Sequence, residues 1–333
     1  MNQAAVAERP ADQGKQRAPR NRTIVLTDAD RARLRPRLTS EISTPLKLDS
    51  TVHGDCLELS RAITDGAVDL LFLDPPYNLD KSFNGRRFAR RSVDEYTAWL
   101  ESALCRFLPK LKPTASVYIC GDWLSSASIF AAASKNLIVR NRVTWEREKG
   151  RGASANWKNS SEDIWFCTVG DDYVFNLDAV RLRRRVLAPY TQSDGTPKDW
   201  QRDGTSGYRD TCPSNFWSDI TIPFWSMPEN TDHPTQKSEK LVAKLLLAST
   251  NPGDLIFDPF LGSGTTSVVA KKLGRRFLGV EIDEEYCLLA ERRLEIAADM
   301  NSIQGFADGV FWERNSQPSR SSVPAAQFAF DGE

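Results

Sequence analysis

The chain has 333 residues, of which 40% are hydrophobic and 26% charged, and its 44 basic and 44 acidic side chains balance to a formal charge of zero. These proportions are those of a soluble globular protein, and no apolar run is long enough to cross a bilayer. The polar start does not resemble a secretory signal, and the six cysteines form no Cys-x-x-Cys pair. With only two histidines, the sequence predicts neither a disulfide framework nor a metal site, and it favours a cytoplasmic protein.

Residues 1–22 are rich in Ala, Gln, Arg, Asn and Pro and lack an apolar period, which is typical of a disordered basic segment. The residues from Thr27 to Asp30 can cap a short helix that continues through Leu34. A solvated tail is the ordinary interpretation of this arm, and a contact with phosphate groups is the alternative.

From residue 50 on, apolar segments of strand length alternate with segments of helical periodicity. This alternation predicts an α/β fold in which helices cover a mainly parallel sheet. Strands are expected at 52–55, 68–73, 115–120, 138–145, 163–168 and 173–176, and helices at 56–63, 94–108 and 125–134.

The strand expected at 68–73 runs directly into Asp74-Pro75-Pro76-Tyr77. Prolines cannot donate to a sheet ladder, so the strand must end there. A carboxylate, a carbonyl and an aromatic ring thus gather at a carboxyl-terminal strand end, where open α/β sheets bind ligands. Asp55 ends a strand one helix earlier, which predicts that both carboxylates lie on one edge of a parallel sheet. For Asp-Pro-Pro alone, a Pro-rich turn is the ordinary alternative.

The α/β alternation stops between residues 180 and 232, which are rich in Arg, Pro, Gly, Ser, Asp and Trp. We interpret this stretch as an inserted module or a long irregular segment. The alternation returns with helices at 238–249, 262–273 and 284–298 and strands at 255–257 and 276–280. The polar residues beyond 300 are expected to form a loose tail.

Residues 257–266 read Phe-Asp-Pro-Phe-Leu-Gly-Ser-Gly-Thr-Thr and link a strand to a helix. Gly262 and Gly264 let the backbone approach a ligand closely, and the helix N-terminus offers free N–H groups. A lone Gly-x-Gly is weak evidence, because tight turns need glycine anyway. Glu281, however, ends the next strand, from where a carboxylate can bind ribose hydroxyls. The combination predicts a nucleoside cofactor, and the lack of a Walker lysine argues against phosphate transfer.

These motifs resemble those of site-specific DNA amino-methyltransferases of the permuted β class. Asp-Pro-Pro-Tyr at 74–77 precedes Phe-x-Gly-x-Gly at 260–264, the order that defines the class, and His-Pro-Thr-Gln-Lys stands at 233–237. Over residues 50–298 the resemblance implies a Rossmann-like, circularly permuted methyltransferase sheet, S-adenosylmethionine as cofactor and double-stranded DNA as partner. The implied regions are an arm (1–45), a catalytic half (46–179), a target-recognition region (180–232), a cofactor-binding half (233–300) and a tail (301–333).

The resemblance also implies roles for single residues at the cofactor. Asp258 and the glycine-rich turn would hold its methionine part, Thr235 and Lys237 would lie near its carboxylate, and Glu281 would bind the ribose. Asp55 matches the acid that binds adenine. The residues implied at the cofactor are Asp55, Cys56, Thr235, Lys237, Asp258, Phe260, Gly262, Ser263, Gly264, Thr265 and Glu281.

The motif 74–77 suggests how an exocyclic amine is methylated. The Asp74 carboxylate and the Pro75 carbonyl can each accept one N–H of the amine and aim its lone pair at the methyl group, so transfer needs positioning rather than an enzyme nucleophile. The target base must be flipped out of the duplex, and Tyr77 beside Pro76 offers a face for stacking. An aspartate at the first position of the motif favours adenine N6 over cytosine N4 in this family. No catalytic cysteine is needed.

Two arginine-rich stretches are candidate phosphate contacts, although a solvated face is the ordinary interpretation of one such run. Cytosine N4 methylation, an RNA methyltransferase, an inactive DNA-binding regulator and a nicotinamide dehydrogenase are the alternatives; the last gives Asp-Pro-Pro-Tyr no role. The resemblance suits a nucleoid-associated enzyme, and it leaves open a homodimer and a cognate restriction endonuclease. The candidate DNA contacts are Arg86, Arg87, Arg90, Arg91, Arg181, Arg183, Arg184 and Arg185.

Overall fold

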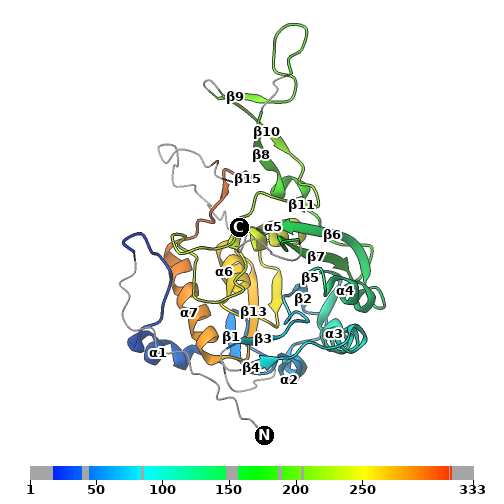
Figure 1. Ribbon diagram of the computed structural model, residues 1–333, viewed down its shortest axis with the longest axis vertical. Coiled ribbons are helices and arrows are strands. Elements are labelled where there is room, and N and C mark those ends of the chain that lie inside the picture. The colour runs from blue at the N-terminus through cyan, green and yellow to red at the C-terminus, as the bar shows by residue number, and fades with distance from the viewer. Residues whose placement is uncertain are drawn as a thin grey trace, which may run out of the picture.

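The computed structural model describes residues 18–39, 45–83, 86–147, 157–186, 190–203, 206–314 and 316. Most of the arm predicted at 1–22, and the tail beyond 316, lie outside the described residues. The described part consists of a large sheet between helices and a small sheet that projects from it along the long axis of the molecule (Figure 1).

The large sheet has eight strands, and the first five in spatial order are parallel. The seventh strand of the chain, β7, runs antiparallel to both of its neighbours, and β11 extends the edge parallel to β6. In spatial order the strands are β1 (Ser50–His53), β13 (Arg276–Glu281), β12 (Leu255–Asp258), β2 (Val68–Leu73), β5 (Leu111–Gly121), β7 (Ser161–Thr168), β6 (Ile138–Glu146) and β11 (Phe216–Trp217).

Helices cover both faces of this sheet because its strands are apolar on both sides. In β2, Leu70 and Phe72 face one buried cluster, whereas Leu71 and Leu73 face the other. The first cluster includes residues of α5 (Glu239–Ser249), α6 (Thr265–Lys272) and α7 (Glu284–Asp299); the second includes residues of α2 (Cys56–Leu59), α3 (Val93–Phe107) and α4 (Ser126–Ala133). Short 3₁₀ turns are η1 (Arg35–Arg37), η2 (Ser60–Ala62), η3 (Leu108–Lys110) and η4 (Leu177–Val180).

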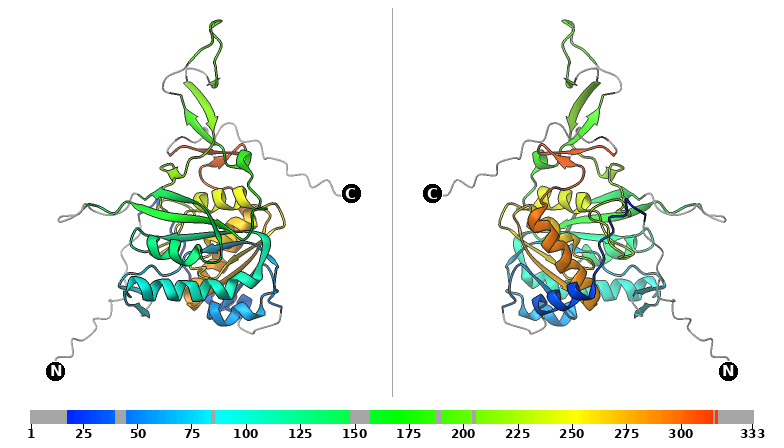
Figure 2. Two further views of the ribbon diagram at one scale, coloured as in Figure 1. Left: turned by 90° about the vertical axis from the view of Figure 1, so that its right-hand side faces the viewer. Right: turned by 90° about the vertical axis from the view of Figure 1, so that its left-hand side faces the viewer.

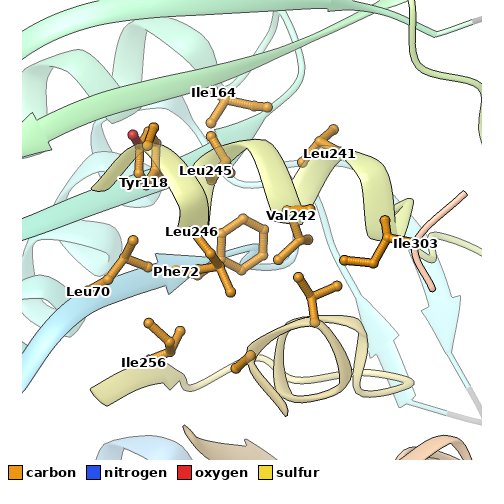
Figure 3. Packing of buried hydrophobic residues seen from close by; sticks show 14 of the residues in the cluster. Leu70, Phe72, Tyr118, Ile164, Leu241, Val242, Leu245, Leu246, Ile256 and Ile303 are labelled. Carbon is orange, nitrogen blue, oxygen red and sulfur yellow. The ribbon is translucent and has the colours of Figure 1, made fainter. Parts of the chain in front are cut away.

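The ends of these helices follow from local sequence. Ser92 and Glu95 form a reciprocal capping box at the start of α3, and Asp283 caps α7 through the Tyr286 N–H. The helix α5 is buried along nearly its whole length, and its leucines and Val242 pack on Leu70, Phe72 and Ile256 (Figure 3). This burial makes α5 the centre of the core on its face of the sheet.

The residues between 180 and 232 form more regular structure than the sequence predicts. A second, five-stranded sheet combines β14 (Phe306–Ala307), β15 (Val310–Trp312), β8 (Leu182–Arg185), β10 (Ser206–Thr211) and β9 (Gln201–Asp203). Its outer strands project from the large sheet in all views (Figures 1 and 2). A separate hairpin is formed by β3 (Lys81–Phe83) and β4 (Arg86–Phe88).

The prediction of a loose tail beyond residue 300 is wrong for its first part. Ile303 and Phe311 are buried, and β15 pairs in parallel with β8, so the chain end completes the small sheet. Phe311 also lies against the Lys244 ammonium, and Lys244 forms an ion pair with Asp219 in the core beneath. The apolar residues of β14 and β15 therefore attach the small sheet to α5.

Two further expectations are corrected. Residues 173–176 form no strand; instead, the Asn176 side chain donates to carbonyls of Leu247 and Thr250 and thereby caps the end of α5. The strands β1 and β2 are not neighbours, because β13 and β12 lie between them. They are nevertheless parallel, so their carboxyl ends meet the same edge of the sheet, as predicted.

The N-terminal segment is packed wherever it is described. The predicted helix exists as α1 (Asp28–Leu34), capped by Thr27, and it lies along α7 (Figure 1). Arg31 pairs with Glu285 at 2.7 Å and Arg35 with Glu284 at 2.8 Å. These arginines are thus engaged with acidic groups of α7 rather than presented as a basic arm.

Candidate active site

A cavity opens at the carboxyl edge of the large sheet, where β12 and β2 lie side by side. From β2 the chain crosses one face of the sheet through α3, and from β12 it crosses the other face through α6. This is the switch point at which open α/β sheets bind their ligands. The cavity is lined by residues 74–77 after β2, by 235–237, by Asp258 and the following turn, and by 281–283 after β13.

Asp74 stands in the cavity wall with its carboxylate held by a lysine. The Lys237 ammonium lies 2.8 Å from Asp74 Oδ1 and 2.6 Å from Oδ2. Tyr77 donates its hydroxyl to Oδ1 at 3.0 Å. Since Lys237 is only 6% exposed, this ion pair is shielded from solvent. Asp74 is therefore a fixed acceptor rather than a mobile surface acid.

A second carboxylate completes this group. Glu162, in β7, lies 3.2 Å from the Tyr77 hydroxyl and 3.4 Å from the Lys237 ammonium, and it forms an ion pair with Arg147. Burial and the two carboxylates raise the pKa of Tyr77 well above its usual value. For Lys237, burial alone would lower the pKa, but Asp74 and Glu162 outweigh it and raise the pKa. The lysine is therefore charged at neutral pH.

The glycine-rich turn after β12 needs its two glycines for different reasons. Gly262 has φ +54°, and a Cβ there would lie 3.0 Å from the His233 ring. The lack of a side chain at Gly262 therefore lets the turn pack closely against His233 in the cavity wall. Gly264 has φ +83°, and a Cβ there would lie 2.5 Å from the Ala290 side chain of α7. Gly264 is not among the lining residues. Its glycine is required by the close approach of two helices, not by a ligand.

Two carboxylates on the β12–β13 side of the cavity have no cationic partner within the described ranges of the chain. Asp258 is buried and accepts the Phe260 N–H at 3.0 Å; burial, with smaller contributions from Asp74 and Glu281, raises its pKa to about 7. Glu281 accepts the N–H groups of Gly262 and Asp283, and burial raises its pKa as well. This side of the cavity is thus suited to a ligand that carries positive charge and hydroxyl groups.

His233 closes the cavity beside the glycine-rich turn. Its ring meets Tyr286 edge-on at 4.4 Å, and its Nδ1 is buried with no hydrogen-bond partner among the described residues. Burial and the nearby charges of Lys237 and Arg293 lower the pKa of His233 to about 3, so the ring is neutral. An unsatisfied buried nitrogen on a cavity wall is an unused contact for a polar ligand.

Most of the residues that the sequence associated with the cofactor are brought together. Asp55 and Cys56 are not: the Asp55 side chain is exposed and caps α2 through the Leu57 N–H at 2.8 Å, and the Cys56 thiol is buried. Lys237 lines the cavity, but its ammonium binds Asp74, which the sequence did not predict. The lining residues among those predicted are Thr235, Lys237, Asp258, Phe260, Gly262, Ser263, Thr265 and Glu281.

The predicted arginines are spread over two surfaces. In the small sheet, Arg183 pairs with Asp210 at 2.7 Å and stacks on Tyr208, so it belongs to the packing of that sheet and is not a free phosphate contact. Arg181 pairs with Asp178 at 2.7 Å, whereas Arg184 and Arg185 are exposed.

The other arginine stretch lies near β4 and the start of α3. Arg90 and Arg91 are exposed, and the Arg91 guanidinium lies over the Trp99 ring at 5.7 Å. Arg86 and Arg87 are in β4, and their side chains are outside the described part of the chain.

Several residues of the site carried no signal that sequence reasoning used. Glu162 and Asp163 are adjacent acids at the start of an otherwise apolar strand, and both are buried; charged side chains are rarely buried unless they are paired. Arg293, on α7, is buried and donates to the Ser263 carbonyl and the Thr265 hydroxyl at 2.9 Å each. These two hydrogen bonds hold the backbone of the glycine-rich turn against α7.

Comparisons with known proteins agree with the motifs. A family model described as DNA methylase matches residues 68–292. The DNA adenine methyltransferase YhdJ of Escherichia coli K12 is 34% identical over 74% of this chain and 83% of its own length. The type II methyltransferase M.BglII of Bacillus subtilis is 29% identical over 77% of this chain and 71% of its own length.

Solved structures share the fold. The PvuII DNA methyltransferase, described as cytosine-N4-specific, covers 80% of this chain and 93% of its own with a TM-score of 0.54 at 17% identity. The M1.HpyAVI–SAM complex covers 73% of this chain and 98% of its own, with a TM-score of 0.50 at 22% identity. The fold class and the family resemblance predicted from the sequence are thereby confirmed.

Among the described residues, no helix combines the length and the apolar character that a membrane span requires. The same part of the chain contains no group of three or more His, Cys, Asp or Glu side chains arranged to hold a metal ion.

Proposed function

The chain belongs to the DNA methylase family, and we propose that it transfers a methyl group from S-adenosylmethionine to the N6 amine of an adenine flipped out of double-stranded DNA. The observation that carries this proposal is the single cavity that joins Asp74 and Pro75 on one side to Asp258 and Glu281 on the other. One side offers acceptors for an amine, and the other offers carboxylates for a cationic nucleoside.

The residues present fit S-adenosylmethionine. Asp258 is buried and Glu281 half-buried, and neither carboxylate has a cationic partner among the described residues, which suits an ammonium group, a sulfonium and ribose hydroxyls. His233 Nδ1 adds an unsatisfied nitrogen in the same wall. When bound, this cofactor supplies an electrophilic methyl group. Thr235 and the turn around Gly262 would hold its methionine part, and Glu281 its ribose.

Asp74 and Pro75 orient the substrate amine. An exocyclic amine has two N–H donors, and its lone pair is delocalised into the ring. When the Asp74 carboxylate and the Pro75 carbonyl each accept one N–H, the nitrogen is drawn toward tetrahedral geometry and its lone pair is directed out of the ring plane. The barrier is thus lowered by position and by the negative charge of Asp74, which stabilises the positive charge that develops on nitrogen.

Tyr77 provides the surface on which the flipped base stacks. Its hydroxyl is held between Asp74 and Glu162 and fixes the plane of the ring. A preset ring lowers the entropy lost when the base enters. Such a platform is expected of enzymes that take a base out of the stack.

Adenine is favoured over cytosine for two reasons. The first residue of the motif is Asp74, which in this family is typical of adenine N6 methylation, and a relative at 34% identity is named a DNA adenine methyltransferase. Cytosine N4 methylation is the second candidate, because the same two acceptors fit either amine.

Several wider features also belong to this proposal. The projecting small sheet is the target-recognition region, and the exposed Arg90, Arg91, Arg184 and Arg185 contact phosphates. Relatives named type II methyltransferases favour a cognate restriction endonuclease, and action on DNA favours a nucleoid location. A homodimer is also compatible, and light scattering would test it.

Nucleoside analysis tests the proposal. The purified protein is incubated with unmethylated duplex DNA and methyl-labelled S-adenosylmethionine, and the digested DNA is separated by chromatography. Label in N6-methyladenine is the expected result. Label in N4-methylcytosine would establish the second candidate, and the absence of label from DNA of diverse sequence, with the cofactor still bound, would contradict the proposed activity.

A further inference from the structure

Three charged side chains meet around one hydroxyl group in the catalytic half of the cavity, and a fourth pairs with one of them. Asp74 follows β2, Arg147 follows β6, Glu162 lies in β7 and Lys237 precedes α5; the Tyr77 hydroxyl lies within 3.2 Å of Asp74, Glu162 and Lys237. Glu162 and Lys237 are 3% and 6% exposed. Two anions and two cations form a neutral group that is shielded from solvent. In these low-dielectric surroundings the charge of each member strongly affects the others.

The hydrogen bonds of this group make the two oxygens of Asp74 different. A carboxylate oxygen has two lone pairs that can accept hydrogen bonds. Oδ1 already accepts from both the Lys237 ammonium, at 2.8 Å, and the Tyr77 hydroxyl, at 3.0 Å. Of the residues that the structure describes, only Lys237 donates to Oδ2, at 2.6 Å. The remaining acceptor position of Asp74 is therefore on Oδ2.

We propose that Lys237 and Glu162 are positioning residues for methyl transfer: Lys237 keeps Asp74 ionised with Oδ2 available to the substrate amine, and Glu162 holds Lys237 and Tyr77 in place. This inference rests on the proposed function, since it assigns the arrangement to the same reaction. It also assigns Lys237 a different partner: the ammonium binds Asp74, the acceptor of the substrate amine, and not the carboxylate of the cofactor.

Glu162 is needed because a buried ammonium is costly without enough negative charge around it. The titratable groups around Lys237 are Asp74, Tyr77, Glu162, the thiol of Cys120 in β5 and His233, whose lowered pKa keeps it neutral. Burial raises the pKa of the Cys120 thiol well above its usual value, and the pKa of Tyr77 is also raised, so both are neutral. The two carboxylates are thus the only anions that face the ammonium in this part of the described structure.

The two positioning residues predict opposite changes in the pH dependence of transfer. In Glu162→Gln the side chain keeps its size and loses its charge, so the pKa of Lys237 falls; the rate should decline at alkaline pH, at least about one pH unit below any decline of the wild type. In Lys237→Met, Asp74 loses its cation while Arg147 remains on Glu162, so the poorly solvated carboxyl of Asp74 favours its protonated form. The rate at pH 7 should fall about 100-fold and recover as pH rises.

The measurement is the single-turnover rate of adenine methylation, with saturating DNA and S-adenosylmethionine, from about pH 6 to about pH 9.5. Lys240→Met is the matched control. Lys240 is also a buried lysine of the same region, paired with Asp219 at 2.7 Å, and Lys244 remains on Asp219 when it is replaced. Its variant should lose stability and keep the wild-type pH profile.

The outcomes separate this inference from the function. If the wild type makes no N6-methyladenine, the proposed function itself fails. If the wild type is active and both variants keep its pH profile, losing only stability, the residues are structural and the positioning role is overturned. Opposite shifts of the two profiles support it. If Lys237→Met fails to fold, the pH at which the transfer rate of Glu162→Gln declines decides by itself whether the positioning role holds.

Discussion

The two sides of the cavity are charged in different ways. On the side of β2, the Asp74 carboxylate is already neutralised by Lys237 at 2.6 Å. On the side of β12 and β13, Asp258 is buried and Glu281 half-buried, neither meets a cation in the described part of the chain, and the pKa of each is raised. A buried carboxylate that is paired needs no ligand to stay ionised, whereas an unpaired one gains most when a cation arrives. The first side is thus prepared for an amine and the second for a positively charged cofactor.

Replacing Asp74 should have the largest effect, because it removes one of the two acceptors of the amine. Asp74→Ala should lower the single-turnover rate by at least about a thousandfold. Binding of S-adenosylmethionine should change little, since Asp258 and Glu281 remain. Calorimetry on the same preparation is the control, and transfer near the wild-type rate would refute the assigned role of Asp74.

Gly264 tests whether the turn on the β12 side is fixed by packing. Gly264→Ala should lower the free energy of unfolding by about 3 kcal/mol, because the new Cβ would meet Ala290 and the backbone has positive φ. Gly253→Ala is the matched control: its φ is +86°, but a Cβ there meets nothing within 4 Å. Denaturant titration of both variants separates the clash from backbone strain; equal losses would show that packing against α7 does not matter.

Asp258 tests the unpaired side directly. Asp258→Asn keeps the size of the side chain and an oxygen for the Phe260 N–H, but it loses the charge. Affinity for S-adenosylmethionine should fall about 10- to 100-fold, the usual range for one charged hydrogen bond. Calorimetry with the cofactor alone measures this. An unchanged dissociation constant would remove Asp258 from the cofactor site.

Arg183 and Arg185 lie two residues apart in β8, and the sequence predicts a DNA contact for both. Their replacement should nevertheless have different effects. Arg185 is exposed, and Arg185→Ala should weaken DNA binding a few-fold at all sequences and reduce the salt slope by about 1. Arg183 is engaged with Asp210 and Tyr208, and Arg183→Ala should instead cost about 1 kcal/mol of stability. Fluorescence anisotropy and thermal unfolding distinguish them, and a reversal of the two effects would contradict the assignment.

Sequence reasoning found the β12 side more completely than the β2 side, for a physical reason. Asp258, Gly262 and Glu281 lie in one β-α-β unit, so short motifs and their spacing are sufficient to bring them together. The surroundings of Asp74 are assembled from distant segments, and no local pattern shows that Glu162 will reach Tyr77 or that Arg147 will pair with Glu162.

The errors have the same origin. Asp55 does not end the strand, because β1 stops at His53; its carboxylate caps α2, since the nearest N–H groups are those of the following helix. The segment at 303–312 is a short apolar stretch in an otherwise polar tail, and only its pairing with β8 reveals that Ile303 and Phe311 belong to a core. Strands and helices of the large sheet, with strong periodicity, were predicted well.

The dependence of cofactor affinity on pH tests the contrast between the two sides most directly. Asp258 has a pKa of about 7 beside Asp74 and Glu281, and a cationic ligand favours its ionised form. Affinity for S-adenosylmethionine, measured by calorimetry between about pH 5.5 and about pH 7.5, should therefore rise with pH, by up to about tenfold per unit below 7, and binding should release a proton. In Asp258→Asn the affinity should be flat over this range. A flat affinity in the wild type, without proton release, would contradict the account.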